Sequence, residues 1–291
     1  MSRAIRDAGF TVALSGTGGD ELFGGYPTFP DLPVLQRWLG RAGFVPRALR
    51  VAAARLATWP LRRSDQAVPP QTRWAKLPDM VSRGDDLIAL YQMASALFLP
   101  GWQQELLAPG HADVLADGLP SAMRQRLAAE TGGRTPWSAI SVMEQRLFLG
   151  ERLLRDNDVA SMAASLEQRV PLVDHVLFEA IDRLPDGVRY QPLGRKALLR
   201  RIGLRGLDPA LFDRPKSGFV LPFNRWIRQG LKDVMDRTMR DPQAIAPCGL
   251  DPGAVGRLWQ TFLEGGSGFY WSRVWSIYVF VRWCHRNRVF R

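Results

Sequence analysis

A glycine-rich turn that follows a short apolar run carries the residues best suited to chemistry. Thr11 to Leu14 have the composition of a short buried strand, and the glycines that follow free the backbone to turn sharply. Glycines let successive N–H groups point into one concavity, which is how a chain holds phosphate oxygens without cationic side chains. The residues of this predicted phosphate-facing loop are Ser15, Gly16, Thr17 and Gly18.

Two carboxylates, Asp20 and Glu21, follow the loop at once. Beside a phosphate they would repel it unless a divalent cation lay between, and Mg²⁺ is the usual partner of phosphates in proteins. We therefore expect Asp20 to contact Mg²⁺ that is held through a phosphate. The alternative is a tight turn whose acids cap the next helix, and a single glycine-rich loop does not decide between the two.

Two later blocks, residues 153–174 and residues 194–226, are dense in charges set among small and apolar residues. The sequence has only four lysines, and two of them, Lys196 and Lys216, fall within residues 194–226, the third block. In a chain that otherwise uses arginine, a lysine indicates that a compact point charge is needed. For Lys216, in a Pro-Lys-Ser-Gly stretch, an ordinary turn lysine is the alternative.

With all three blocks in this order, the chain resembles the C-terminal synthetase part of the glutamine-hydrolysing asparagine synthetases, over roughly residues 8 to 235. In that family a glutaminase domain releases ammonia, and a synthetase domain uses ATP to activate a carboxylate as an acyl-adenylate. The resemblance implies a strongly α-rich α/β fold. It would be the C-terminal portion of an adenine-nucleotide alpha-hydrolase-like (ATP-pyrophosphatase) domain, with one short strand left from its parallel sheet.

The resemblance also implies roles for individual residues. Lys196 matches the lysine that neutralises pyrophosphate, where fixed positive charge lowers the barrier. Glu167 is the second residue with an implied catalytic role, within a Glu-x-Arg element. The implied contacts to nucleotide or adenylate are Ser15, Gly16, Thr17, Gly18, Asp20 and Glu21, and the implied supporting residues are Arg169, Asp174 and Lys216.

The chain departs from the family pattern at two places. Thr17 stands where asparagine-forming members usually have a glutamate, so the acceptor is either aspartate or another carboxylic acid. The sequence also lacks the family's Ser-Gly-Gly-x-Asp-Ser loop, and it has no cysteine before Cys248 to serve as a glutaminase nucleophile. We expect a partner protein or a further segment to supply the glutaminase and the pyrophosphatase loop, with nitrogen from ammonia or glutamine. The alternative is a truncated pseudoenzyme or an interaction module without catalysis.

Charge and composition limit the remaining classes of function. The net charge of +11 would suit a polyanion, but the arginines are dispersed and no nucleic-acid recognition module is present, so we expect no specific nucleic-acid binding. Non-specific polyanion binding is the alternative. The two cysteines and three histidines show no metal-ligand spacing. No signal peptide or membrane span is visible, and we expect a cytoplasmic protein without a membrane partner.

The elements that must position these residues are mostly helical. We expect one partial domain, with a motif-bearing part over residues 1–240 and a helical extension over 241–291. Thr135 and the proline after it should begin a helix that reaches about Arg155, where Asp156 to Asp158 either stop it or cap the next helix. Asp158 is open to either a capping role or a site role.

Two further expectations concern the second block and the first strand. Asp174 should cap a helix that ends near Pro185. Glu167 and Arg169 should lie on an extended link, either at the site or in a buried network that braces the fold. If the strand at residues 11–14 is the last of a larger sheet, one of its edges should be exposed.

Overall fold

The computed structural model describes residues 1–62, 72, 74–110, 115–116, 118–208, 212, 221–266 and 268–290. The chain divides into two compact units, each made of two stretches. Met1–Trp38 and Gln125–Lys216 form the first unit, and Leu39–Arg124 and Ser217–Arg291 form the second. The candidate site residues all belong to the first unit, although Lys216, its last residue, lies outside the described residues.

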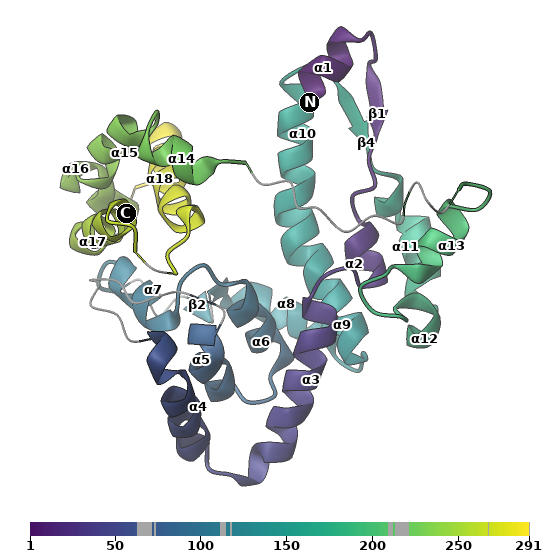
Figure 1. Ribbon diagram of the computed structural model, residues 1–291, viewed down its shortest axis with the longest axis horizontal. Coiled ribbons are helices and arrows are strands. Elements are labelled where there is room, and N and C mark those ends of the chain that lie inside the picture. Colours follow the sequence, from purple (N-terminus) through teal and green to yellow (C-terminus); the bar gives the residue numbers. More distant parts are fainter. Residues whose placement is uncertain are drawn as a thin grey trace. The chain divides into compact units, whose positions relative to one another are not determined.

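The first unit is mainly helical and contains one described pair of strands (Figure 1). Helices α3 and α8 cross from one unit into the other along the chain. The elements of this unit are α1 (Ser2–Asp7), β1 (Val12–Leu14), α2 (Gly19–Phe23), α3 (Thr28–Arg41), α8 (Ser121–Thr131), α9 (Pro136–Met143), α10 (Leu154–Met162), β4 (Glu167–Arg169), α11 (His175–Asp182), α12 (Asp186–Arg189) and α13 (Ala197–Gly203).

The strands β1 and β4 pair in parallel and lie beside α10 in Figure 1, which confirms a helix-rich α/β fold with a short parallel sheet. Val12 pairs with Glu167, and Leu14 pairs with Arg169. Residues 167–169, expected as an extended link, are thus a second strand. Among the described strands β4 is the only neighbour of β1, so the other edge of β1 is unpaired there, as expected. Leu14 is 74% exposed, so the expectation of a buried strand is wrong, because nothing in the described residues covers this face of a two-stranded sheet.

One long helical stretch precedes β4. Thr135 caps it as expected, because its hydroxyl accepts the backbone N–H of Ser138. The stretch runs through α9, a π-helical segment (Glu144–Leu153) and α10, so the expectation that residues 156–158 would end or cap a helix is wrong. Asp and Asn side chains replace helical hydrogen bonds only where the backbone is free to leave the helix. Here the helix continues to Met162, and Ser165 follows in a left-handed conformation, with φ of 54°.

A buried guanidinium ties the helices of the first unit together. Arg189 is 1% exposed, and it donates hydrogen bonds to the carbonyl of Leu22, the hydroxyl of Ser141 and the carboxylate of Asp182. Ser141 in turn donates to the carbonyl of Glu21 at 2.8 Å. Hydrogen bonds from α9 and α12 to its backbone therefore fix the short helix α2, and Asp182 of α11 holds Arg189 in place.

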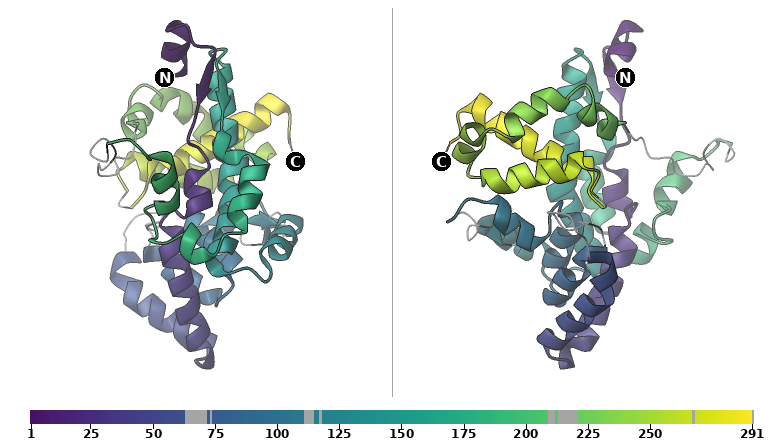
Figure 2. Two further views of the ribbon diagram at one scale, coloured as in Figure 1. Left: turned by 90° about the vertical axis from the view of Figure 1, so that its right-hand side faces the viewer. Right: turned by 60° about the vertical axis from the view of Figure 1, so that its left-hand side comes forward.

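The second unit is helical and has its own core. Helix α17 (Pro252–Leu263) buries Val255, Leu258, Trp259 and Phe262 in one core with Phe98, Trp102 and Leu106. Figure 2 shows α14 to α18 gathered in one cluster. The elements of this unit are α4 (Arg47–Arg62), α5 (Leu77–Ser82), α6 (Leu87–Ser95), α7 (Pro100–Leu106), β2 (Leu115–Ala116), β3 (Leu119–Pro120), α14 (Phe223–Arg228), α15 (Lys232–Met239), α16 (Pro242–Ile245), α17 (Pro252–Leu263) and α18 (Trp271–Asn287).

Within the described residues, no helix has both the length and the apolar character that crossing a membrane requires.

The shared carboxylate of Asp182 makes the stability of the first unit sensitive to acid. Burial alone would raise the pKa of Asp182, but hydrogen bonds from Arg134 and Arg189 outweigh it and hold the pKa below its ordinary value of 3.8. A depressed folded-state pKa contributes stability above the unfolded value, and this contribution is lost as pH falls through the folded value. Asp182→Asn should lower the free energy of unfolding by about 3 kcal/mol at neutral pH, because Arg189 keeps a buried charge without its partner.

The measurement is urea unfolding of both proteins at several pH values between about 7 and 2, and the difference between them should shrink at the acid end. Glu179→Gln is the control, because its carboxylate is exposed and lies 3.7 Å from Arg183. An acid dependence that is the same in both variants would contradict this account.

Candidate functional site

The loop after β1 is held by side-chain hydrogen bonds. Ser15 and Thr17 share a hydrogen bond of 2.8 Å between their hydroxyls, and the backbone N–H of Thr17 donates to the Ser15 hydroxyl. Asn157, on α10, donates to the Thr17 hydroxyl at 3.0 Å. The backbone N–H of Ser15 donates to the carbonyl of Arg169, so β4 ends beside the loop. The loop thus lies at the carboxyl ends of two parallel strands, where ligands bind in open α/β sheets.

Two glycines of the loop have different reasons to be glycine. Gly18 has φ of 101°, and a Cβ there would lie 3.0 Å from Cγ2 of Val173. The fold itself therefore requires glycine at this position. A Cβ on Gly16 would meet no atom within 4 Å, and Gly16 is exposed. The backbone at Gly16 is therefore open to the close approach of a ligand.

An ion pair joins the loop to the third block, residues 194–226. Lys196 Nζ lies 2.9 Å from Asp20 Oδ1, and both side chains are about one-quarter to one-third exposed. Lys196 has φ of 50°, in the left-handed region, just before α13. Gly25 makes room for the carboxylate, since a Cβ there would lie 1.7 Å from Asp20 Oδ1. The structure thus brings together Asp20 and Lys196, which the sequence places in separate blocks.

Glu21 has surroundings unlike those of Asp20. It is 1% exposed and accepts a hydrogen bond of 2.7 Å from the hydroxyl of Tyr26. Burial, and then the neighbouring carboxylate of Glu21, raise the pKa of Tyr26 well above its usual range. Glu21 therefore points into the protein. Both acids lie in the first turn of α2, as the alternative of a turn followed by a helix expects, but no side-chain hydrogen bond caps the start of this helix.

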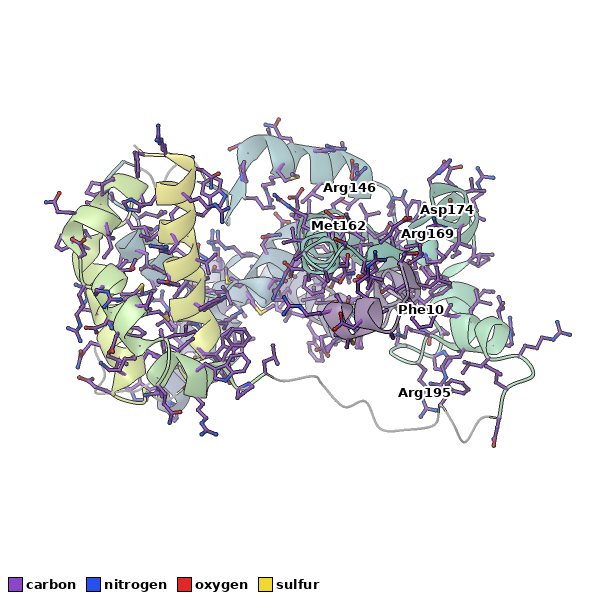
Figure 3. The ribbon with its side chains drawn as sticks, turned by 90° about the horizontal axis from the view of Figure 1, so that it is seen from above. Phe10, Arg146, Met162, Arg169, Asp174 and Arg195 are labelled. Atoms are coloured by element: carbon purple, nitrogen blue, oxygen red, sulfur yellow. The ribbon has the colours of Figure 1, made fainter. Side chains whose placement is uncertain are left out.

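Glu167 and Arg169 form an exposed pair on β4. Their side chains are 57% and 62% exposed, and Arg169 Nε lies 2.7 Å from Glu167 Oε1, which raises the pKa of Arg169. The alternative of a buried bracing network is therefore wrong. Because Glu167 pairs with Val12, it stands two residues before the end of the strand that reaches the loop. Arg169, labelled in Figure 3, pairs with Leu14 at the end of the sheet that leads into the loop.

Asp174 has the capping role that the sequence predicts. Its carboxylate accepts the backbone N–H groups of Val176 and Leu177, at the start of α11. A cap of this kind stabilises a helix by about 1 kcal/mol. Asp174 therefore helps to fix α11, from which Asp182 reaches Arg189.

Asn157 is the site residue that sequence reasoning missed, because its neighbours suggested a helix stop. The feature of the sequence that could have identified it is its spacing of four residues from Leu153 and Ser161, and of eight from Leu149, which places these side chains on one face of a helix. Leu149 and Ser161 are buried, so this spacing places Asn157 on a partly buried stripe. Gly25, whose missing Cβ admits Asp20, gave no such signal.

Among the residues that the structure describes, no group of three or more His, Cys, Asp or Glu side chains could hold a metal ion. Asp20 alone is a partly exposed carboxylate at the loop, so a cation there would need most of its ligands from phosphate oxygens and water.

Gly25→Ala tests whether the glycine keeps the ion pair in place. The added methyl group would overlap the Asp20 carboxylate and force it away from Lys196. We expect a loss of about 1–3 kcal/mol in the free energy of unfolding, measured with urea. Gly187→Ala is the control, since a Cβ there has no neighbour within 4 Å. Equal stability of the two variants would show that Asp20 can move without cost.

Comparison with known proteins gives one family. The family model "Asparagine synthase" matches residues 1–285. A Mycobacterium bovis protein named as an asparagine synthetase (glutamine-hydrolyzing) is 30% identical over 281 residues, covering 94% of this chain and 39% of its own length. Asparagine synthetase (glutamine-hydrolyzing) 1 of Bacillus subtilis is 24% identical over 237 residues, covering 81% of this chain and 34% of its own length. No solved structure matches. The chain belongs to the asparagine synthase family.

Proposed function

We propose that this chain supplies one side of the nucleotide site of an ATP-dependent ligase, which forms an amide from a carboxylic acid by way of an acyl-adenylate. The observation that carries the proposal is the Asp20–Lys196 pair at the open end of the glycine-rich loop. Family membership supports ATP as the nucleotide. We further propose that the short parallel sheet is part of an adenine-nucleotide alpha-hydrolase-like (ATP-pyrophosphatase) fold.

The donor set at the loop fits a nucleotide phosphate. The hydroxyls of Ser15 and Thr17, the accessible backbone at Gly16 and the ammonium of Lys196 offer hydrogen-bond donors and one positive charge. Lys196 would stabilise the negative charge that builds on phosphate oxygens as pyrophosphate leaves. Asp20 would orient Lys196, and it would contact Mg²⁺ that is held mainly by the phosphates. The cation would neutralise phosphate charge.

Glu167, Arg169 and Asp174 would act from the second block. We propose that Asp174 fixes the start of α11 and that Arg169 supports the loop through its backbone carbonyl. Glu167 keeps its proposed catalytic role, although a rotation of its exposed side chain away from Arg169 would be needed. Lys216 is proposed on the sequence alone.

The acceptor acid would lie near Thr17. Its hydroxyl and the Asn157 amide form a neutral polar pair in place of a carboxylate. A neutral pair would not attract the ammonium of an amino acid by charge, so acceptors other than aspartate are compatible with this site. Nitrogen would come from ammonia or from glutamine.

The open edge of β1 is where we propose that the rest of the site attaches. Ser15 donates to β4 and Thr11 accepts from it, so Val12 and Leu14 direct their backbone groups to the opposite edge. The chain spans 39% of the length of its Mycobacterium bovis relative. A further segment or a partner protein would add strands at this edge and supply the glutaminase and the pyrophosphatase loop. A cytoplasmic location remains a prediction. An interaction module without catalysis would use the same edge but show no turnover.

Lys196→Ala should abolish most ATP–pyrophosphate exchange, measured with Mg²⁺ and a supplied glutaminase and pyrophosphatase segment. Removing one group that stabilises transition-state charge costs about 100-fold or more. Arg195→Ala is the matched control, because it removes one positive charge from the exposed neighbouring residue, labelled in Figure 3. Exchange that is equally fast in both variants would remove Lys196 from the mechanism, and its absence in the unaltered protein would favour the interaction module.

Hydrogen exchange should report on the open edge. The amide N–H groups of Val12 and Leu14 should exchange quickly in the chain alone and become protected when the missing segment is added. Ser15 serves as an internal control, since its N–H already donates to Arg169 at 2.9 Å. Full protection of Val12 and Leu14 in a monomeric chain would contradict the proposed attachment.

A further inference from the structure

A cavity of about 430 Å³ lies within the first unit, apart from the nucleotide loop. Its walls are mainly aliphatic and aromatic, and include Leu22, Leu149 and Phe178. Leu22 and Leu149 are buried. The residues proposed to contact nucleotide are not among its lining residues in the described part of the chain. Its volume and apolar walls are typical of sites for small organic ligands.

The charged residues of this cavity carry an excess of positive charge. Arg134, Arg146 and Glu130 line it, and Glu130 is the single acidic residue of the described lining. The Glu130 carboxylate accepts hydrogen bonds from both Arg126 and Arg146. One carboxylate shared by two guanidinium groups leaves one positive charge uncompensated.

A second cluster, formed by Asp182, Arg134 and Arg189, has the same arrangement as the cluster of Glu130, Arg126 and Arg146. The Asp182 carboxylate accepts hydrogen bonds from both Arg134 and Arg189. Hydrogen bonds from these arginines, working against burial, hold the pKa of Asp182 low, and Arg146 and Arg126 do the same for the pKa of Glu130. Both acids are therefore ionised at neutral pH. Of these four guanidinium groups, Arg134 and Arg146 line the cavity together with the carboxylate of Glu130, which leaves an excess of one positive charge among its charged lining residues.

We propose that this cavity binds a small amphiphilic anion, a carboxylate with an unbranched apolar chain. The chain would lie against Leu22, Leu149 and Phe178, and the carboxylate would lie beside Arg146 and Arg134. Each methylene group that leaves water strengthens binding about fourfold. The anion fits because the charge-assisted hydrogen bonds that Arg146 and Arg134 can donate to a carboxylate are stronger than those to a neutral group of the same shape. Its lining residues differ from those proposed to contact nucleotide, although Val173, which lines it, packs against Gly18 of the loop.

The experiment is isothermal titration calorimetry of the whole chain with octanoate, hexanoate and octanamide. We expect octanoate to bind about fifteenfold more tightly than hexanoate, because it buries two more methylene groups. Octanamide should bind at least tenfold more weakly than octanoate, since it has the same chain without the charge. Octanamide binding as tightly as octanoate, or no saturable octanoate binding, would overturn the proposal.

Variants locate the binding to the cavity. Arg146→Gln should weaken octanoate binding about tenfold. The Arg146 side chain is half-exposed, so we expect this variant to fold normally. Arg152→Gln is the matched control, because it lies on the same π-helical segment, is 69% exposed and does not line the cavity. Leu149→Phe, checked for folding by circular dichroism, should reduce binding by filling the cavity. Equal affinities in Arg146→Gln and Arg152→Gln would place the binding elsewhere.

Discussion

The guanidinium of Arg189 is the group on which the placement of the candidate site depends. It is buried, and it holds the backbone of α2 at Leu22 while it binds Ser141 and Asp182. The short helix α2 could not be stable alone, because the few hydrogen bonds of so short a helix do not offset the free-energy cost of its nucleation. The position of Asp20 relative to Lys196 is therefore set by tertiary hydrogen bonds and not by local helix propensity.

The adjacent acids Asp20 and Glu21 lie in one turn but have opposite surroundings, so only one of them is accessible at the candidate site. Glu21 is enclosed and bound by Tyr26, so it serves the interior of the unit. Asp20 stays partly exposed beside Lys196 and depends on the missing side chain of Gly25. A sequence pair that reads as one acidic motif thus divides into a structural residue and a candidate site residue.

The sequence predicted the local features well and the long-range ones less well. The loop after the strand, the cap at Thr135 and the cap at Asp174 all follow from short patterns whose physics is local. The pairing of β1 with β4 could not be read in the same way, because three-residue strands carry almost no periodic signal. The continuation of α10 through Asn157 was missed because a tertiary contact to Thr17 outweighs the capping preference of an Asp-Asn-Asp run. Lys196 stood out by its residue type, yet its partner Asp20 emerged only from the fold.

The left-handed backbone of Lys196 has a consequence for how this region could change. A residue with a Cβ pays about 1–2 kcal/mol to occupy that conformation, whereas glycine does so freely. Glycine in place of this lysine would therefore make the polypeptide more robust while it discarded the cation. Selection for thermal tolerance and selection for chemistry would push this position in opposite directions, so the residue found there is a measure of which pressure prevails.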